Sequence, residues 1–149
     1  PGQYPFADLV LHRQALDVQN KVAACMTTLL FSDFLDPYPD VSVQVANLGG
    51  ALPMVIERMD HALALRAPDA APPTSQARRV HVDCSSLGAR SLELAVAIYG
   101  ADRIMVGTDC PIFRTDWTLQ AITDARITED ERSAVRGGNA AELLRRFEI

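Results

Sequence analysis

The chain has 149 residues, of which 48% are hydrophobic and 22% are charged, and its formal net charge is −5 with a pI near 5.1. This size and apolar content predict a single globular domain over residues 1–149 with a buried core. An acidic chain without clustered Lys and Arg argues against a nucleic-acid surface, and its apolar stretches are shorter than the ~20 residues that span a bilayer.

The three cysteines, Cys25, Cys84 and Cys110, are odd in number and widely spaced. This spacing forms neither a disulfide framework nor a CxxC metal motif, so we expect a reducing, cytoplasmic environment. No basic-then-apolar leader is visible. The sequence begins at Pro1 without an initiator Met. We therefore expect a processed product or a piece of a longer chain.

The first half of the chain predicts a helix, a strand and a second helix. Apolar residues recur at a spacing near 3.6 over residues 8–34, which is typical of a helix, and the prolines of DPYPD end it. Residues 41–47, VSVQVAN, alternate as a strand does. Gly49 and Gly50 then allow a tight turn, and a helix follows from Pro53 to about Arg66.

A second strand–helix unit and a third strand follow in the second half. Residues 79–84 predict a strand, and the following helix ends at Gly100, which we expect to adopt the left-handed conformation of a helix stop. Residues 103–109, RIMVGTD, predict the third strand.

Three short helices are predicted to close the chain. The first covers residues 119–125. Thr128 and Glu131 form a capping box that begins the second. Gly137 and Gly138 separate it from the last helix.

The strand starts lie 25 to 35 residues apart, which requires crossover connections and therefore a parallel sheet in an α/β fold. Three parallel strands leave two open edges and an uncovered face. A complete α/β barrel needs about 250 residues. We therefore expect this unit to require either missing chain or another subunit.

Polar residues follow each predicted strand: Asn47, Asp83 and Asp109. The carboxyl ends of adjacent parallel strands share one edge, so these side chains should face one mouth. Asp109 is the strongest candidate, because Gly107 lets other groups approach and Pro111 fixes the exit. Asp83 could instead accept hydrogen bonds from the neighbouring backbone.

The three histidines are weaker candidates, since none pairs at HxH or HExxH spacing. We interpret His12 and His61 as surface or capping residues. His81 shares a strand face with Asp83 and could line the interior, although a structural hydrogen bond is favoured.

The remaining polar motifs have both structural and functional interpretations. Cys84 and Cys110 each follow a strand-end aspartate and could approach one another on adjacent strands, but we expect both to be buried, inert thiols. Arg58 and Arg66 lie on one predicted helix, either as a solvated face or, for Arg66, as a group that binds a carboxylate in a bidentate manner. Neither a GxSxG elbow nor a GxGxxG turn after a strand is present.

Four segments resemble a known family: VQVANLGGALPMVIERMDHALALR, VHVDCSS, DRIMVGTDCPIF and TEDERSAVRGGNAAELL. They look like the C-terminal half of the amidohydrolase-2 family, whose members are metal-dependent barrels similar to α-amino-β-carboxymuconate-ε-semialdehyde decarboxylase. The likeness runs from about Val22 to Phe147. It implies an α/β fold that forms the C-terminal part of a (β/α)8 TIM-type barrel.

The resemblance also implies roles for four residues. Asp109 matches the metal-binding aspartate of the eighth strand, where it would hold zinc, with manganese as the alternative, or accept a proton from metal-bound water. Asn47 stands where the family usually carries an acid/base histidine; it cannot exchange a proton near neutral pH but can orient a water or a substrate oxygen. Arg66 matches an arginine contributed to the substrate carboxylate of a neighbouring subunit, and Arg58 matches an arginine of the same helix.

The activity implied is that of a metal-dependent decarboxylase or hydrolase, a lyase or hydrolase acting on a small carboxylated compound, with a hydratase as a further possibility. The family's HxH pair and the histidine of its fifth strand have no counterpart here, so this chain supplies an incomplete set of metal ligands. A catalytic zinc takes about three protein ligands. The expected partner is a second copy, giving a homodimer, or the missing barrel half. A non-catalytic half-barrel that acts by association is the alternative from another class.

Overall fold

The computed structural model describes residues 12–85 and 87–146, and its centre is a parallel sheet of three strands. The strands lie in chain order, β1 (Gln44–Val45), β2 (His81–Asp83) and β3 (Ile104–Met105). In register, Val45 pairs with Val82, and Val82 pairs with Ile104. The parallel sheet with crossover connections predicted from the strand spacing is confirmed.

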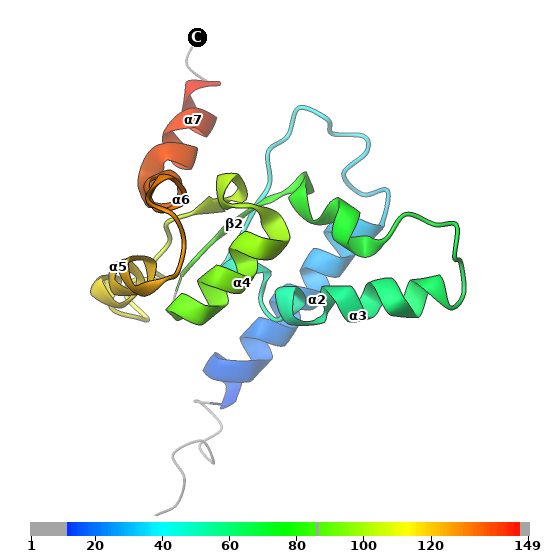
Figure 1. Cartoon of the computed structure of the whole chain (residues 1–149), viewed down its shortest axis with the longest axis horizontal. Helices are drawn as coiled ribbons and strands as arrows, with labels where there is room; N and C mark the ends of the chain where they lie inside the picture. Colours follow the sequence, from blue (N-terminus) through cyan, green and yellow to red (C-terminus); the bar gives the residue numbers. More distant parts are fainter. Residues whose placement is uncertain (1–11, 86, 147–149) are drawn as a thin grey trace, which may run out of the picture.

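Helices connect and flank the strands, and Figure 1 shows α5, α6 and α7 on one side of α4, with α2 and α3 on the other. The α-helices of the described residues are α2 (Val18–Phe31), α3 (Leu52–Ala64), α4 (Ala89–Tyr99), α5 (Thr115–Asp124), α6 (Glu129–Ser133) and α7 (Asn139–Arg145). Short helical turns are η2 (Arg13–Asp17), η3 (Asn47–Gly49), η4 (Pro73–Arg79), η5 (Ala101–Arg103) and η6 (Ala134–Gly138). None of the helices in the described ranges is both long and apolar enough to cross a membrane.

The core lies between the sheet and these helices. Val82 and Ile104 are fully buried on the helix-facing side, together with Leu52, Ile56 and Tyr99. Because successive side chains of a strand point to opposite faces, His81 and Asp83 lie on the other face of β2. That face is the one a closed barrel would turn inward.

The strands are shorter than predicted. The backbone adopts a positive φ of 55° at Asn47, which takes the chain out of β1, and β3 ends at Met105, four residues before Asp109. Asp109 therefore lies in the loop after the strand and not at the strand end.

Two helix boundaries also differ from the prediction. The described part of the first helix runs from η2 to Phe31, and residues 8–11 of the predicted helix lie outside the described residues. α5 begins at Thr115, before the predicted residue 119. Gly100 has the expected positive φ of 85°, but its ψ of 144° is extended and not left-handed helical.

The capping box and the helix break that were predicted near the C-terminus are both confirmed. Thr128 Oγ1 accepts a hydrogen bond from the Glu131 amide at 3.2 Å, and the Glu131 carboxylate accepts one from the Thr128 amide at 2.8 Å, which is the capping box. The backbone departs from helical geometry at Gly137, where η6 separates α6 from α7.

Candidate functional site at the carboxyl ends of the strands

The NLGG segment leaves β1 through four consecutive residues with positive φ, from Asn47 at 55° to Gly50 at 66°. A side chain rarely fits at such a backbone conformation. A Cβ on Gly49 would lie 2.7 Å from the Tyr99 hydroxyl oxygen, and a Cβ on Gly50 would lie 2.2 Å from the carbonyl oxygen of Gln19 in α2. The tight turn predicted at these glycines is confirmed, and close packing is a second reason for them.

Two hydrogen bonds attach this turn to the helices around it. The Tyr99 hydroxyl at the end of α4 donates to the Leu48 carbonyl at 3.1 Å, and the Ala51 amide donates to the Gln19 carbonyl at 3.2 Å. Tyr99 is fully buried, and burial raises the pKa of its hydroxyl well above its ordinary value of 10. Asn47 is thereby held at a fixed place beside the end of β2.

Asp83 is the centre of a buried polar network at the carboxyl ends of β1 and β2. Its Oδ1 accepts the backbone amides of Asn47 at 3.1 Å and Ser85 at 3.0 Å. Its Oδ2 accepts the Gln44 side-chain amide at 3.1 Å. Asp83 therefore accepts hydrogen bonds from the neighbouring backbone, as its structural interpretation predicted.

Ser85 connects Asp83 to the Asn47 side chain. Its hydroxyl lies 3.0 Å from Asn47 Oδ1 and also contacts Asp83 Oδ1. Asn47, Asp83 and Ser85 are 7%, 9% and 4% exposed. The network is thus almost closed to solvent within this chain and holds Asn47 through its side-chain oxygen and its backbone amide.

Gly107 brings the chain after β3 against the same network. A Cβ on Gly107 would lie 2.7 Å from Asp83 Cγ, so no other residue could follow this path without a shift. The close approach predicted at Gly107 is real, and the group that approaches is Asp83.

Asp109 lies beyond Gly107 on an exposed loop, with a φ of 55°. Its carbonyl accepts the amides of Ile112 at 2.9 Å and Phe113 at 3.2 Å, which folds the loop back on itself. Within the described residues, its carboxylate has no hydrogen-bond or ion-pair partner. It is therefore open to bind an external cation, but no contact joins it to the Asp83 network.

The two candidate arginines do not lie at the carboxyl ends of the strands. Arg58 and Arg66 are exposed, and α3 starts at Leu52 beside the NLGG turn. At 1.5 Å per residue, the other end of α3 is about 20 Å away. The chain's own fold therefore does not bring Arg66 to the strand ends.

A catalytic zinc site takes about three protein ligands. In the described ranges no three His, Cys, Asp or Glu side chains gather in a way that could hold a metal ion. Asp109 fits as one carboxylate ligand, whereas Asp83 is already occupied by hydrogen bonds.

The weaker candidates lie away from this site or are buried. His81 lies at the amino end of β2, and burial, followed by the positive charges of Arg103 and Arg146, lowers its pKa. Cys84 is buried, and burial raises its pKa; Cys110 is exposed, and both are free thiols. The burial expected of Cys84 is confirmed, whereas the burial expected of Cys110 is wrong. The His81 side chain makes no hydrogen bond to another described residue, so the hydrogen bond favoured for it is not observed.

Sequence reasoning missed Ser85 and Gln44. Ser85 follows Asp83 by two residues, and a side chain that accepts the amide two residues on is a common Asx turn. That local signal was available in the sequence. Nothing in the sequence indicated Gln44, because its contact with Asp83 depends on the register of the sheet.

With this geometry established, comparison with known proteins gives a consistent result. A family model described as amidohydrolase matches residues 15–146. The gamma-resorcylate decarboxylase of Polaromonas sp. strain JS666 is 28% identical over 127 residues, which is 78% of this chain and 38% of that protein.

Solved structures show the same fold. The dihydroxybenzoic acid decarboxylase of Polaromonas sp. JS666, with bound manganese and 2-nitroresorcinol, superposes with a TM-score of 0.78 at 22% identity over 100% of this chain and 49% of its own. The 2,6-dihydroxybenzoate decarboxylase of Rhizobium gives a TM-score of 0.76 at 21% identity over 99% of this chain and 50% of its own. The chain thus spans half or less of the length of these proteins.

Proposed function

The chain belongs to the amidohydrolase family, and from this premise we propose that it forms the C-terminal part of a metal-dependent decarboxylase acting on a small aromatic carboxylate. The observation that carries the proposal is the arrangement at the strand ends. Three adjacent parallel strands deliver Asn47, Asp83 and the Asp109 loop to one edge of the sheet, where barrel enzymes keep their chemistry.

The decarboxylase activity is favoured over hydrolysis by the relatives. The Polaromonas gamma-resorcylate decarboxylase supports it most directly, since its likeness covers 78% of this chain. We propose this activity for the whole protein, to which this chain contributes the later strands.

Asp109 is the proposed metal ligand of this chain. Its carboxylate is exposed and unpartnered among the described side chains, and a carboxylate is a suitable ligand for zinc or manganese. When bound, a divalent ion would act as a Lewis acid that polarises a substrate oxygen. The manganese in the Polaromonas crystal structure supports a divalent ion without choosing between the two metals.

Asn47 is proposed to orient a substrate oxygen or a water and not to transfer a proton. An amide does not titrate near neutral pH. Its contact with Ser85 Oγ at 3.0 Å and the bond from its backbone amide to Asp83 hold it in one orientation. Such fixed positioning is what an active site requires of a polar group that stabilises charge.

Arg66, two residues after the end of α3, is proposed to bind a substrate carboxylate, and Arg58 within α3 is proposed as a second substrate-binding residue. Both are exposed, and the length of α3 separates Arg66 from the strand ends of its own chain. The substrate would therefore belong to a neighbouring subunit, which makes a homodimer part of this proposal.

The experiment measures CO₂ release from 2,6-dihydroxybenzoate by the full-length protein, together with its metal content by elemental analysis. We expect stoichiometric zinc or manganese and turnover that chelation removes. Asp109→Asn should lose both metal and activity with little change in the thermal unfolding midpoint. Asp130→Asn, which alters an exposed aspartate of α6, is the matched control.

Two outcomes would contradict the proposal. Full metal content and turnover in Asp109→Asn would remove the ligand assignment. A full-length protein that assembles but neither holds metal nor releases CO₂ would favour the half-barrel that acts only by association.

A further inference from the structure

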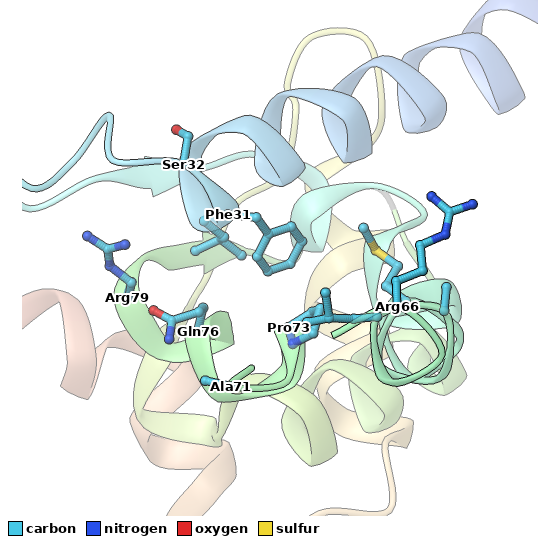
Figure 2. Close-up of a pocket in the computed structure, with 11 residues that line it drawn as sticks. Phe31, Ser32, Arg66, Ala71, Pro73, Gln76 and Arg79 are labelled. Atoms are coloured by element: carbon cyan, nitrogen blue, oxygen red, sulfur yellow. The ribbon is translucent and has the colours of Figure 1, made fainter. Parts of the chain in front are cut away.

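A small cavity of about 120 Å³ opens at the amino ends of β2 and β3, between these strands, η5 and α7. Apart from Leu143, its lining is polar or charged and consists of His81, Asp102, Arg103, Asn139, Glu142 and Arg146. The cavity in Figure 2, between α2, α3 and η4, is of another kind, because it has about 700 Å³ and a mostly apolar lining. The small cavity therefore has the size and the character of an ion site and not of a pocket for an organic body.

Both carboxylates of this lining have partners outside the cavity. The Arg78 guanidinium contacts the two oxygens of Asp102 at 2.9 and 2.8 Å. Glu142 pairs with Arg145 at 2.5 Å, one turn along α7. Four arginines, two in the lining and two outside it, thus surround two carboxylates, which leaves an excess of two positive charges.

Three donor groups of the lining are unused. Arg146, directly after α7, has no hydrogen bond or ion pair from its side chain to another described residue, and the His81 ring has no hydrogen bond to one. Arg103 Nε is buried without a hydrogen-bond partner among the described residues and forms only a long ion pair, at 3.4 Å, with Asp102 Oδ2. A buried N–H group without an acceptor is costly, so an acceptor is expected in the cavity.

The two arginines of the lining act on the same place. Burial, followed by the positive charges of Arg103 and Arg146, lowers the pKa of His81. Asn139 holds the walls together, because its side-chain amide donates to the carbonyls of Ala101 and Ile104, both at 2.7 Å, and so attaches α7 to the start of β3. Donors that are fixed in advance bind a ligand without the cost of ordering them.

We propose that this cavity binds a small tetrahedral oxyanion, inorganic phosphate or the phosphoryl end of a larger compound, between Arg103, Arg146 and His81. The planar fork of each guanidinium matches two oxygens of a phosphate. Donors from β2, η5 and the end of α7 suit an anion with four oxygens better than a carboxylate with two. The site lies at the opposite ends of the strands from Asn47, so the inference is independent of the activity proposed there.

The test titrates the full-length protein, labelled with ¹³C in its histidine rings, with sodium phosphate at pH 7 and constant ionic strength, and records NMR spectra. The His81 ring signal is identified by its loss in His81→Gln. We expect this signal to shift and to saturate. The signal of His61, an exposed residue of α3, should stay in place.

Sodium sulfate, which keeps its double negative charge between pH 5 and pH 8, tests the same contact through titration. A bound dianion offsets the charges of Arg103 and Arg146, which lower the pKa of His81 in its absence. We expect sulfate to raise the pKa of His81 by about 1. Sodium chloride at the same ionic strength should change this pKa much less.

Charge variants move the affinity in opposite directions. Arg146→Gln should weaken phosphate binding about tenfold or more, the usual size of a charge-assisted pair. Glu142→Gln removes a carboxylate from the lining and should strengthen binding by about threefold. Arg13→Gln, at an exposed arginine of η2 that is not part of the lining, is the matched control and should leave the affinity unchanged.

Glycerol 3-phosphate distinguishes the two sources of the ligand. If it shifts the His81 signal with the affinity of inorganic phosphate, the site accepts the phosphoryl end of a larger compound. Binding that is at least about tenfold weaker identifies free phosphate as the ligand.

Three results would overturn the proposal. The first is a His81 signal that does not move at the highest phosphate concentration the protein tolerates. The second is an equal shift with sodium chloride at matched ionic strength, because the effect would then be general screening. The third is an affinity for phosphate that neither falls in Arg146→Gln nor rises in Glu142→Gln.

Discussion

Asp83 connects three segments that are distant in sequence. Its two oxygens accept the Asn47 amide, the Ser85 amide and the Gln44 side chain, and Gly107 packs on its Cγ. A buried carboxylate is expensive unless it is fully hydrogen-bonded, and here backbone donors satisfy it. The residue therefore fixes where β1 ends relative to β2.

Asp83→Asn should lower the free energy of unfolding by about 2 to 3 kcal/mol, because two charge-assisted bonds from backbone amides become neutral and one amide N–H₂ faces other donors. Urea denaturation at pH 7 would measure the change. Asp130→Asn should change the free energy of unfolding by less than about 0.5 kcal/mol. Equal midpoints for the two variants would mean that the network does not hold the strand ends.

Because Tyr99 is buried, we expect the stability of the chain to fall at alkaline pH. Burial raises the pKa of Tyr99 in the folded chain above the ordinary value of 10, so only the unfolded state loses this proton as the pH rises past 10. Stability is full below pH 10 and falls above it, by up to ~1.4 kcal/mol per pH unit.

Tyr99→Phe should remove the part of the alkaline loss that Tyr99 contributes, and it should cost about 1 to 2 kcal/mol at pH 8, where the Leu48 carbonyl loses its donor. Urea midpoints at pH 8 and pH 10.5 would separate the two effects, and Cys84, whose pKa burial also raises, is present in both proteins. Tyr38→Phe, at a residue that is 56% exposed, is the control. A wild-type slope that persists in Tyr99→Phe would assign the loss to another group.

At the scale of elements, the NLGG turn decides how β1 passes into α3. Its backbone lies close to both α2 and α4, which leaves no room for a Cβ at Gly50. Both its positive φ and its close packing therefore favour glycine at position 50. The turn is thus a rigid connection, and the direction of α3 follows from it.

Gly50→Ala should destabilise the chain by about 3 kcal/mol, since it adds a left-handed backbone penalty and an overlap with the Gln19 carbonyl. Gly88→Ala provides the matched control, because a Cβ there would meet nothing within 4 Å. Thermal unfolding of both variants would measure the difference. A Gly50→Ala variant as stable as Gly88→Ala would show that α2 can move away from the turn.

Much of the element pattern could be predicted because it is local. The capping box of Thr128 and Glu131, the turn at Gly49 and the crossover spacing are all properties of neighbouring residues, and each is observed. The likeness to the amidohydrolase family is likewise carried by contiguous motifs such as GTDCP.

The site could be predicted only in part, because its contacts join distant residues. Periodicity does not tell where pairing stops, so β3 was extended to Asp109 although it ends at Met105. The Ser85–Asn47 contact depends on the register between β1 and β2. The packing of η4 on α3 through Thr74 and Asp60 likewise depends on a contact between residues that are distant in sequence.

At the scale of the whole molecule, the sheet has two edges. β1 and β3 each pair on one side only among the described residues, and the chain matches 38% of the length of the Polaromonas decarboxylase. Unpaired edges promote association with further strands.

We expect the 149-residue chain alone to form dimers or larger species at micromolar concentration, as measured by sedimentation velocity. Co-expression with the remaining part of the protein should convert these species to one defined assembly. A chain that remains monomeric over this range would mean that its sheet edges are protected without a partner.

The strand order also bears on how the protein is made. β1, β2 and β3 lie side by side in the order in which a ribosome releases them, and parallel neighbours are joined by their own helix. When a new strand leaves the ribosome, the strand with which it pairs has already left, so the sheet can form during translation one strand at a time. The growing edge is always the newest strand, so the unpaired edge of β2 stays exposed until β3 has been made and pairs with it.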